Sequence, residues 1–169
     1  MKTLFLKNIK KTLKEKKKFE AKLGVKIAGG GRNLTVEGGE VEEYLACLIL
    51  EAVELGFSVE KSLLLTEPDY ILEKIDIKNY TKRQNLAQIR ARIIGRKGET
   101  KELIEELSDC HMALTNNTVG VIGRVENIKN CINAVVKLIR GSKQASVYAY
   151  LERQRRIYHP EDLGLKDKF

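Results

Sequence analysis

Apolar positions recur at helical spacing in several segments of the chain, and glycines separate these segments. In the first half, residues 3–6 form a short apolar run that predicts a strand, and residues 8–23 predict a helix rich in lysine and leucine. Residues 25–36 alternate between apolar and polar around three consecutive glycines, which predicts a β-hairpin. Residues 41–55 then place their apolar side chains on one face of a predicted helix.

The second half of the chain follows the same plan. Residues 84–92 are expected to begin as a strand, and residues 99–108 predict an amphipathic helix. Two short strands are predicted within residues 110–122, joined by an Asn-Asn turn that suits a tight hairpin. Residues 125–139 predict a further amphipathic helix, and a last helix is expected over residues 145–157.

The two halves coincide when they are placed about 85 residues apart. Phe19-Glu20 then falls on Ile104-Glu105, and Gly38 falls on Gly123. A hairpin, a glycine and an amphipathic helix follow at the same spacing in each half. Self-similarity of this kind indicates two copies of one small unit.

The repeat predicts an α+β fold of two tandem units, each with the order β-α-α-β-β-α, with a helix added at the C-terminal end. The expected units are residues 1–79 and residues 80–169. Residues 59–65 and 69–76 have weak patterning and are expected to connect the units. One continuous α+β domain with a shared core stays open as the alternative.

Composition excludes several classes of protein. The chain has 169 residues, of which 43% are hydrophobic and 32% charged, so a packed core is expected. No apolar run reaches the length of about 18 residues that a membrane span needs, and the first residues do not resemble a signal peptide. The three cysteines are odd in number and form no CxxC pair, which disfavours a disulfide framework and a zinc site. A reducing, cytoplasmic location is expected.

Positive charge is concentrated in the second half. Residues 1–80 hold 14 basic and 13 acidic residues, whereas residues 81–169 hold 17 basic and 10 acidic residues. Seven basic residues lie within residues 82–101, where only Glu99 opposes them. Such a concentration favours a polyanionic partner, with a solvated basic face as the alternative. A second lysine cluster at residues 10–18 falls on a predicted helix, where solvation is the simpler explanation.

One motif carries a specific chemistry. Gly95-Arg96-Lys97-Gly98 stands between an apolar segment and an amphipathic helix. Two glycines three residues apart let the backbone approach a ligand closely, and the start of the helix favours a phosphate. A K-homology (KH) domain uses a loop of this kind to clamp about four nucleotides. A glycine loop that binds nothing is the alternative, and no P-loop sequence is present.

The walls of the expected groove come from the segment before the loop and from the strand at residues 110–114. His111 and Met112 lie on opposite faces of that strand, and the pattern does not decide which one faces the groove. Aromatic residues make up 6% of the chain and tryptophan is absent, which favours an aliphatic groove over a stacking platform. Arg153 and Arg156 on the last helix are a secondary candidate contact, with a solvated surface as the alternative.

Nothing in the sequence favours an enzyme. His111 and His159 lie in unrelated settings, and neither a serine nucleophile elbow nor an HExxH motif is present. No catalytic residue, metal or cofactor is therefore expected.

These residues resemble a known family, the archaeal form of the partner-of-Nob (Pno1) ribosome-assembly proteins, which carry two KH domains. The resemblance is densest at ARIIGRKGETKELIEEL (91–107), NNTVGVIG (116–123) and SVYAYLERQRR (146–156). It implies binding to the single-stranded 3′ region of small-subunit rRNA in late assembly, and partnership with the endonuclease that trims that end. It also implies that the protein binds RNA and is not itself an enzyme.

The resemblance implies that residues 95–98 form the clamp and that Arg92 and Lys101 contact phosphates. Together with the charge pattern it gives these candidate RNA-binding residues: Arg90, Arg92, Ile94, Gly95, Arg96, Lys97, Gly98, Lys101, His111, Met112, Arg153 and Arg156.

The chain departs from the family pattern in two places. Lys10-Lys11-Thr12-Leu13 holds the position of the glycine loop in the first unit, so that unit is expected to brace the second or to meet protein. Gln144 stands where family members often have a histidine. Two other functions stay open: a general KH module that binds other RNA, and a protein-binding adaptor that uses the acidic helix at residues 40–54.

Overall fold

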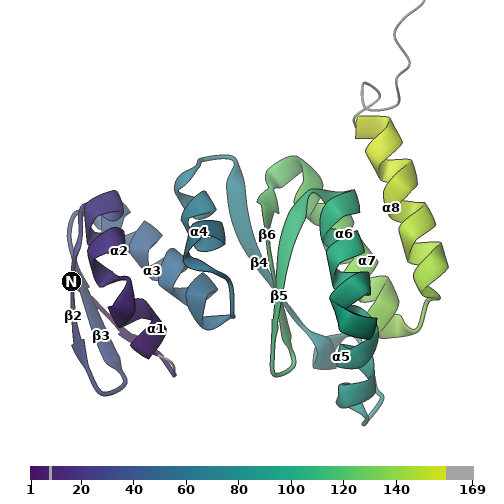
Figure 1. Cartoon of the computed structure of the whole chain (residues 1–169), viewed down its shortest axis with the longest axis horizontal. Helices are drawn as coiled ribbons and strands as arrows, with labels where there is room; N and C mark the ends of the chain where they lie inside the picture. Colours follow the sequence, from purple (N-terminus) through teal and green to yellow (C-terminus); the bar gives the residue numbers. More distant parts are fainter. Residues whose placement is uncertain (8, 159–169) are drawn as a thin grey trace, which may run out of the picture. The chain divides into compact units, whose positions relative to one another are not determined.

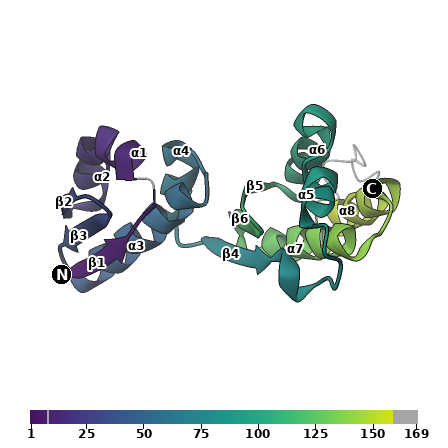
Figure 2. The same ribbon diagram turned by 90° about the horizontal axis from the view of Figure 1, so that it is seen from below.

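The computed structural model describes residues 1–7 and 9–158. The chain divides into two compact units, Met1–Leu72 and Glu73–Phe169. Each unit has a three-stranded sheet with helices packed on one face (Figures 1 and 2). The α+β fold is therefore confirmed. Residues 159–169 of the predicted second unit, His159 among them, lie outside the described residues.

The first unit follows the order β-α-α-β-β-α and ends in two short helical turns. Its sheet has the strand order β1-β3-β2, with both neighbouring pairs antiparallel. Its elements are β1 (Lys2–Phe5), α1 (Ile9–Lys14), α2 (Lys16–Leu23), β2 (Lys26–Gly30), β3 (Asn33–Glu37), α3 (Glu40–Glu54), α4 (Val59–Ser62) and η1 (Leu63–Thr66).

The second unit repeats this order and adds a long helix. Its sheet has the equivalent strand order, β4-β6-β5. Its elements are β4 (Tyr70–Asp76), η2 (Ile77–Asn79), α5 (Leu86–Ile94), η3 (Arg96–Gly98), α6 (Glu99–Ser108), β5 (Cys110–Thr115), β6 (Thr118–Arg124), α7 (Val125–Arg140) and α8 (Gln144–Tyr158). The two units thus share the order of strands in the sheet and the order of helices and strands along the chain, as the repeat predicts.

The strand expected at residues 84–92 is wrong, because these residues form most of α5. The side chain of Asn85 caps that helix by accepting a hydrogen bond from the Gln88 N–H at 3.2 Å. Ile89 and Ile93 are both buried, which is the spacing of a helix and not of a strand. The strand of this unit is instead β4, in a segment that the weak patterning assigned to a connection. The units consequently meet at Leu72 and Glu73, ahead of the expected boundary after residue 79.

The single helix expected over residues 8–23 is two helices, which meet at Glu15. In the order of elements, this junction corresponds to the loop between α5 and α6. The loop position of the first unit is therefore residues 14–16 and not residues 10–13, which lie inside α1.

A polar contact is repeated in the two units at the spacing found in the sequence. The carboxylate of Glu20 on α2 accepts a hydrogen bond from the Ile27 N–H at 2.8 Å, and that of Glu105 on α6 accepts one from the Met112 N–H at 2.7 Å. In each unit the lysine four residues before the glutamate pairs with the same oxygen, at 3.7 Å and 3.2 Å respectively. The second helix of each unit is thereby fixed to its edge strand.

Two glycines of the repeat mark a second shared feature. A Cβ atom on Gly38 would lie 2.9 Å from Cγ1 of Val25, and one on Gly123 would collide with the side chain of Cys110. Val25 directly precedes β2, and Cys110 is the first residue of β5. A larger residue in place of either glycine would therefore push the neighbouring strands apart. The glycine that ends each predicted hairpin therefore has a packing role.

The three cysteines are free and differ in accessibility. Cys110 and Cys131 are buried, whereas Cys47 is half-buried. A hydrogen bond with Cys110, together with burial, raises the pKa of the Cys131 thiol well above its usual value. Burial likewise raises the pKa of Cys47. Among the described residues, no helix has the length and apolar character needed to cross a membrane.

These surroundings predict the order of thiol modification. In the native chain at pH 8, Cys47 is expected to react with a disulfide reagent such as dithionitrobenzoate at least tenfold faster than Cys110 or Cys131, since only thiolates that solvent reaches are nucleophilic. The measurement is the absorbance time course, with cysteine-to-serine variants to assign each phase. Equal rates for all three thiols in the folded chain would contradict the packing of β5 against α7.

Candidate nucleic-acid interface

The loop of residues 95–98 lies between the end of α5 and the start of α6 (Figure 1). Its backbone is unusual, because Gly95, Lys97 and Gly98 have φ angles of 75°, 52° and 83°. This is the left-handed region that residues other than glycine seldom adopt. The turn is therefore compact, and it places the side chains of its two central residues on the surface.

The two glycines of the loop are needed for different reasons. A Cβ atom on Gly95 would lie 2.7 Å from both the backbone nitrogen and the Cβ of Thr100. A Cβ atom on Gly98 would meet nothing closer than a carboxylate oxygen of Glu102 at 3.9 Å. Gly95 is thus required by close packing as well as by its φ angle, whereas Gly98 is required by its φ angle alone.

Thr100 connects the loop to α8. Its side chain is buried, with the residue 4% exposed, and its hydroxyl oxygen accepts hydrogen bonds from Gln144 Nε2 at 3.1 Å and from the Tyr148 hydroxyl at 3.2 Å. Gln144 Nε2 also lies 3.4 Å from the carbonyl oxygen of Arg92. Gln144, which stands where the resemblance leads us to expect a histidine, therefore contacts the loop region, and α8 braces the turn.

Arg96 and Lys97 are the exposed cations of the loop. Across residues 1–7 and 9–158, neither side chain has a hydrogen-bond or ion-pair partner. Ile94, just before the loop, is 38% exposed and offers an aliphatic surface. No side chain caps the N-terminal end of α6, so the partial positive charge of that helix end adds to the charge of the loop. Charged side chains, an apolar surface and an uncapped helix N-terminus thus gather at one place.

Arg92, one of the expected phosphate contacts, is instead bound to the protein. Its guanidinium donates to the Leu138 carbonyl oxygen at 3.0 Å and to the Ser142 carbonyl oxygen, both at the C-terminal end of α7. Both carbonyls lie where α7 ends, and a cation there is favourable because it faces the negative end of the helix dipole. Arg92 therefore adds positive charge beside the loop while its N–H donors hold the end of α7.

Arg90 and Lys101 are also engaged. Arg90 Nη1 donates to Oδ1 of Asn117 at 2.7 Å, in the turn between β5 and β6. Lys101 Nζ pairs with the Glu105 carboxylate at 3.2 Å, the contact that is repeated in the first unit. The structure thus divides the basic residues near the loop into two free cations and three that stabilise the fold.

The two candidate RNA-binding residues of β5, His111 and Met112, differ in their exposure. Met112 is 3% exposed and shares a face of β5 with Cys110, whose thiol contacts Cys131 of α7, so its side chain belongs to the core beneath the helices. His111 is half-buried and lies on the opposite face of the strand. The Met112 side chain therefore does not line an exposed groove.

The arginines of α8 stand apart from the loop. Arg153 and Arg156 are exposed, and they follow Gln144 by nine and twelve residues, which corresponds to about 14 and 18 Å along a helix. They can contact only a stretch of strand that continues beyond the loop. Among the described residues there is no group of three or more histidine, cysteine or acidic side chains that could hold a metal ion.

The family follows from comparison with known proteins. Residues 71–156 match the second KH domain of Pno1, in a family described as eukaryotic type KH-domain (KH-domain type I). The chain is 32% identical over 155 residues to a KH domain-containing protein of Methanocaldococcus jannaschii, a match that covers 88% of the chain. The chain belongs to the Pno1 family of type I KH-domain proteins. The match begins at β4, in agreement with the strand that the structure places in the second sheet.

Two further proteins show how far the similarity reaches. The chain is 33% identical over 105 residues to the pre-rRNA-processing protein pno1 of Schizosaccharomyces pombe, which covers 60% of the chain and 44% of that protein. It superposes on a chain of the a/eIF2alpha–aDim2p–rRNA complex from Pyrococcus horikoshii with a TM-score of 0.83 and 30% identity, covering 92% of the chain and 94% of that chain. The chain spans less than two thirds of the length of the curated relatives, 66% in the case of the Methanocaldococcus protein.

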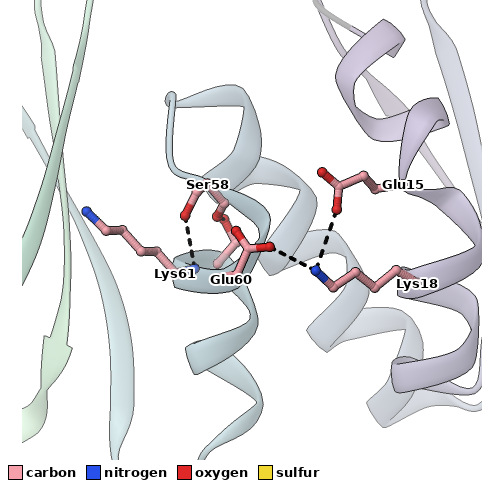
Figure 3. Close-up of polar contacts among 6 residues, drawn as sticks. Glu15, Lys18, Ser58, Glu60 and Lys61 are labelled. Carbon is pink, nitrogen blue, oxygen red and sulfur yellow. Dashed lines mark hydrogen bonds and ion pairs between the residues drawn. The ribbon is translucent and has the colours of Figure 1, made fainter.

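Among the described residues of its first unit, this Pno1-family chain has no equivalent of the glycine loop. Its junction residue, Glu15, has an ordinary φ of −110°. Figure 3 shows Lys18 between two carboxylates, Glu15 at 3.7 Å and Glu60 at 2.8 Å. The hydrogen bond to Glu60 raises the pKa of Lys18 and lowers that of Glu60. Part of the N-terminal lysine cluster is thus used within the unit.

The unequal roles of the two glycines predict unequal effects of alanine. Gly95→Ala is expected to lower the free energy of unfolding by about 3 kcal/mol or more, because a left-handed φ and overpacking against Thr100 add. Gly98→Ala is expected to cost about 1–2 kcal/mol, since only the φ angle is unfavourable. Urea unfolding followed by circular dichroism measures both. A larger loss in Gly98→Ala than in Gly95→Ala would contradict the packing of the loop on Thr100.

Proposed function

We propose that the chain is an RNA-binding factor of ribosome assembly, and that the loop of residues 95–98 binds single-stranded small-subunit rRNA near its 3′ end. The observation that carries this proposal is the free pair Arg96 and Lys97, held on a compact turn at the open N-terminal end of α6. The protein acts by binding, in the cytoplasm, and assists late maturation of the subunit. Its three free cysteines suit a reducing compartment.

The chemistry of the loop suits a sugar–phosphate backbone. The two cations neutralise phosphates, and the positive end of the α6 dipole favours an anion at the same place. Because Gly98 has no side chain, the strand can approach the backbone of the turn closely. Ile94 supplies an apolar surface for a base next to the clamped phosphates. This combination holds an unpaired strand without requiring an aromatic platform.

The comparisons support the same direction. The Schizosaccharomyces relative is named as a pre-rRNA-processing protein, and the Pyrococcus structure is that of a complex with rRNA and a/eIF2alpha. We extend both features to this chain: rRNA as the ligand and other assembly proteins as partners. The endonuclease that trims the 3′ end of the rRNA is the partner that a clamp on that region would serve, because a held strand presents its scissile bond in one place.

The clamp predicts a large effect of charge reversal. Arg96→Asp/Lys97→Asp is expected to weaken binding of a synthetic rRNA 3′-end oligonucleotide about 100-fold or more, because two charge-assisted contacts of about 1.5–3 kcal/mol each are replaced by repulsion. Fluorescence anisotropy measures the affinity. The exposed position of both side chains should leave the unfolding midpoint unchanged.

A matched variant tests which unit holds the RNA. Lys10→Asp/Lys14→Asp makes the same change of charge on exposed residues of α1 and is expected to weaken binding by less than about fivefold. The log–log salt slope of the wild-type chain should be about 0.7 per phosphate contact and should fall by about 1.4 in the loop variant. Unchanged affinity of the loop variant, or equal losses in both variants, would disprove the assignment of the clamp to the second unit.

A specific observation favours a protein contact by the first unit. Val41 and Tyr44 lie at the start of α3 with large apolar side chains in solvent, beside the acidic first turn of that helix. Exposed aromatic and aliphatic groups ringed by charge are typical of protein interfaces. We therefore assign to this surface the docking of an assembly partner, in parallel with RNA binding by the second unit.

The docking role predicts a complex that does not depend on RNA. Pull-down of the trimming endonuclease from the same organism by this chain should survive ribonuclease treatment and should be reduced about tenfold or more in Val41→Ser/Tyr44→Ser. The loop variant Arg96→Asp/Lys97→Asp is the control and should retain the partner. Loss of the partner on ribonuclease treatment would show that RNA alone bridges the two proteins.

A further inference from the structure

A cavity of about 660 Å³ lies beside the loop, on the side of the second unit where α8 packs. Its walls come from α5, the loop, α6 and α8. The side chains that give it chemical character are Gln88, Arg96, Glu99, Leu103, Gln144 and Tyr148. Figure 1 shows α8 running alongside α6, and the two helices are in contact. The cavity is therefore an open depression that is bordered by α5, α6 and α8 and lies next to the loop.

This cavity is distinct from the side of the loop that faces the sheet. On α6, Lys101 and Glu105 point toward β5, where the carboxylate accepts the N–H of Met112. Leu103, two residues after Lys101, lies on the opposite side of the helix and lines the cavity. The strand-facing side and the α8-facing side of the same helix are thus two separate surfaces, joined only at the loop.

The lining of the cavity combines groups that recognise a flat, polar ring. Tyr148 is half-buried, and the hydrogen bond from its hydroxyl to Thr100 fixes the orientation of its ring. Leu103 adds an apolar contact, and Gln88, Glu99 and Gln144 bring amide and carboxylate groups that can pair with donors and acceptors on a ring edge. A tethered aromatic ring with polar groups around it is how proteins hold unstacked nucleobases.

The position of the cavity indicates where that base comes from. Arg96 belongs both to the loop and to the cavity wall, and the charge of Arg92 lies in the same wall. A strand whose phosphates are held by the loop therefore has its neighbouring nucleotide at the mouth of the cavity, and positive charge draws it there.

We propose that this cavity binds one nucleobase of the RNA strand that the loop clamps, turned out toward α8 and stacked on Tyr148. The inference rests on the proposed RNA-binding function and adds to it a base-binding site outside the sheet-facing groove. The strand is then held at two points, by its phosphates at the loop and by a base beside Tyr148.

An abasic scan of the oligonucleotide tests this site on the full chain. Removing single bases in turn from the rRNA 3′-end oligonucleotide should reveal one position where the wild-type chain loses affinity about tenfold. Tyr148→Ala should lose about the same factor with the intact oligonucleotide and should be insensitive to removal of that base. Tyr148→Phe keeps the ring but loses the hydrogen bond to Thr100, so it should keep the sensitivity to that position with an affinity between those of the wild-type chain and Tyr148→Ala.

Two further variants separate base binding from support of the loop. Tyr150→Ala removes a tyrosine on another side of α8, which contacts Asn130, Asn133 and Lys137 of α7, and should behave as wild type in the scan. The side chain of Gln88 lines the cavity from α5 and does not contact Thr100. Gln88→Ala should therefore weaken the binding only of oligonucleotides that carry the critical base.

The outcomes distinguish the two proposals. If Tyr148→Ala weakens intact and abasic oligonucleotides by the same factor at every position, Tyr148 only supports the loop and the base site is disproved, while the clamp stands. If the wild-type chain does not bind the oligonucleotide at all, the clamp fails and the base site fails with it.

Discussion

The close approach of Gly95 to Thr100 is the constraint on which the candidate site depends. Without a Cβ on Gly95, the chain leaves α5 and enters α6 within one compact turn, and the backbone of that turn rests against the buried Thr100 side chain. The hydroxyl of Thr100 then receives two donors from α8. Thr100 thus contacts the loop, lies at the start of α6 and binds the last helix by hydrogen bonds.

The two units show which part of the KH scaffold is independent of the loop. Each unit fixes its second helix to its edge strand by a glutamate that accepts a backbone N–H, with a lysine on the same carboxylate. The first unit keeps this contact although its helices meet at Glu15 in a junction without glycine. The glutamate contact is therefore common to both units, whereas the glycine turn with its exposed charges belongs, among the described residues, to the second unit alone.

The basic residues beside the loop have two functions, which the composition of the segment does not distinguish. Arg90, Arg92 and Lys101 donate to a turn amide, to carbonyls at the end of α7 and to a glutamate. These contacts bring cations close to the loop at the same time as they stabilise the packing of α5, α6 and α7. Arg96 and Lys97 remain for a ligand, set in a field that the other three strengthen. All five cations of this surface attract an anion, whereas, in the part of the chain that the structure describes, only Arg96 and Lys97 are free to bind it.

Much of this protein could be predicted from local pattern. The spacing of apolar residues gave both hairpins and most helices, the offset of 85 residues gave the repeat, and the glycine pair with its basic residues gave the loop. These features are readable because they depend on neighbours within one or two turns of the chain. The strand β4 was missed because its apolar and polar residues alternate weakly, so only its pairing with β6 identifies it.

Tertiary structure decided which side chains are free. The partner of Arg92 lies 46 residues away and the donor to Thr100 from Tyr148 lies 48 residues away, distances over which no periodicity carries information. Met112 and His111 are adjacent in sequence, yet the packing of α7 against one face of β5 buries the first and not the second. The sequence by itself therefore determined the units and the loop, and the tertiary contacts decided which of the charged and polar residues are left to bind a ligand, because a long side chain takes whatever partner the fold brings within reach.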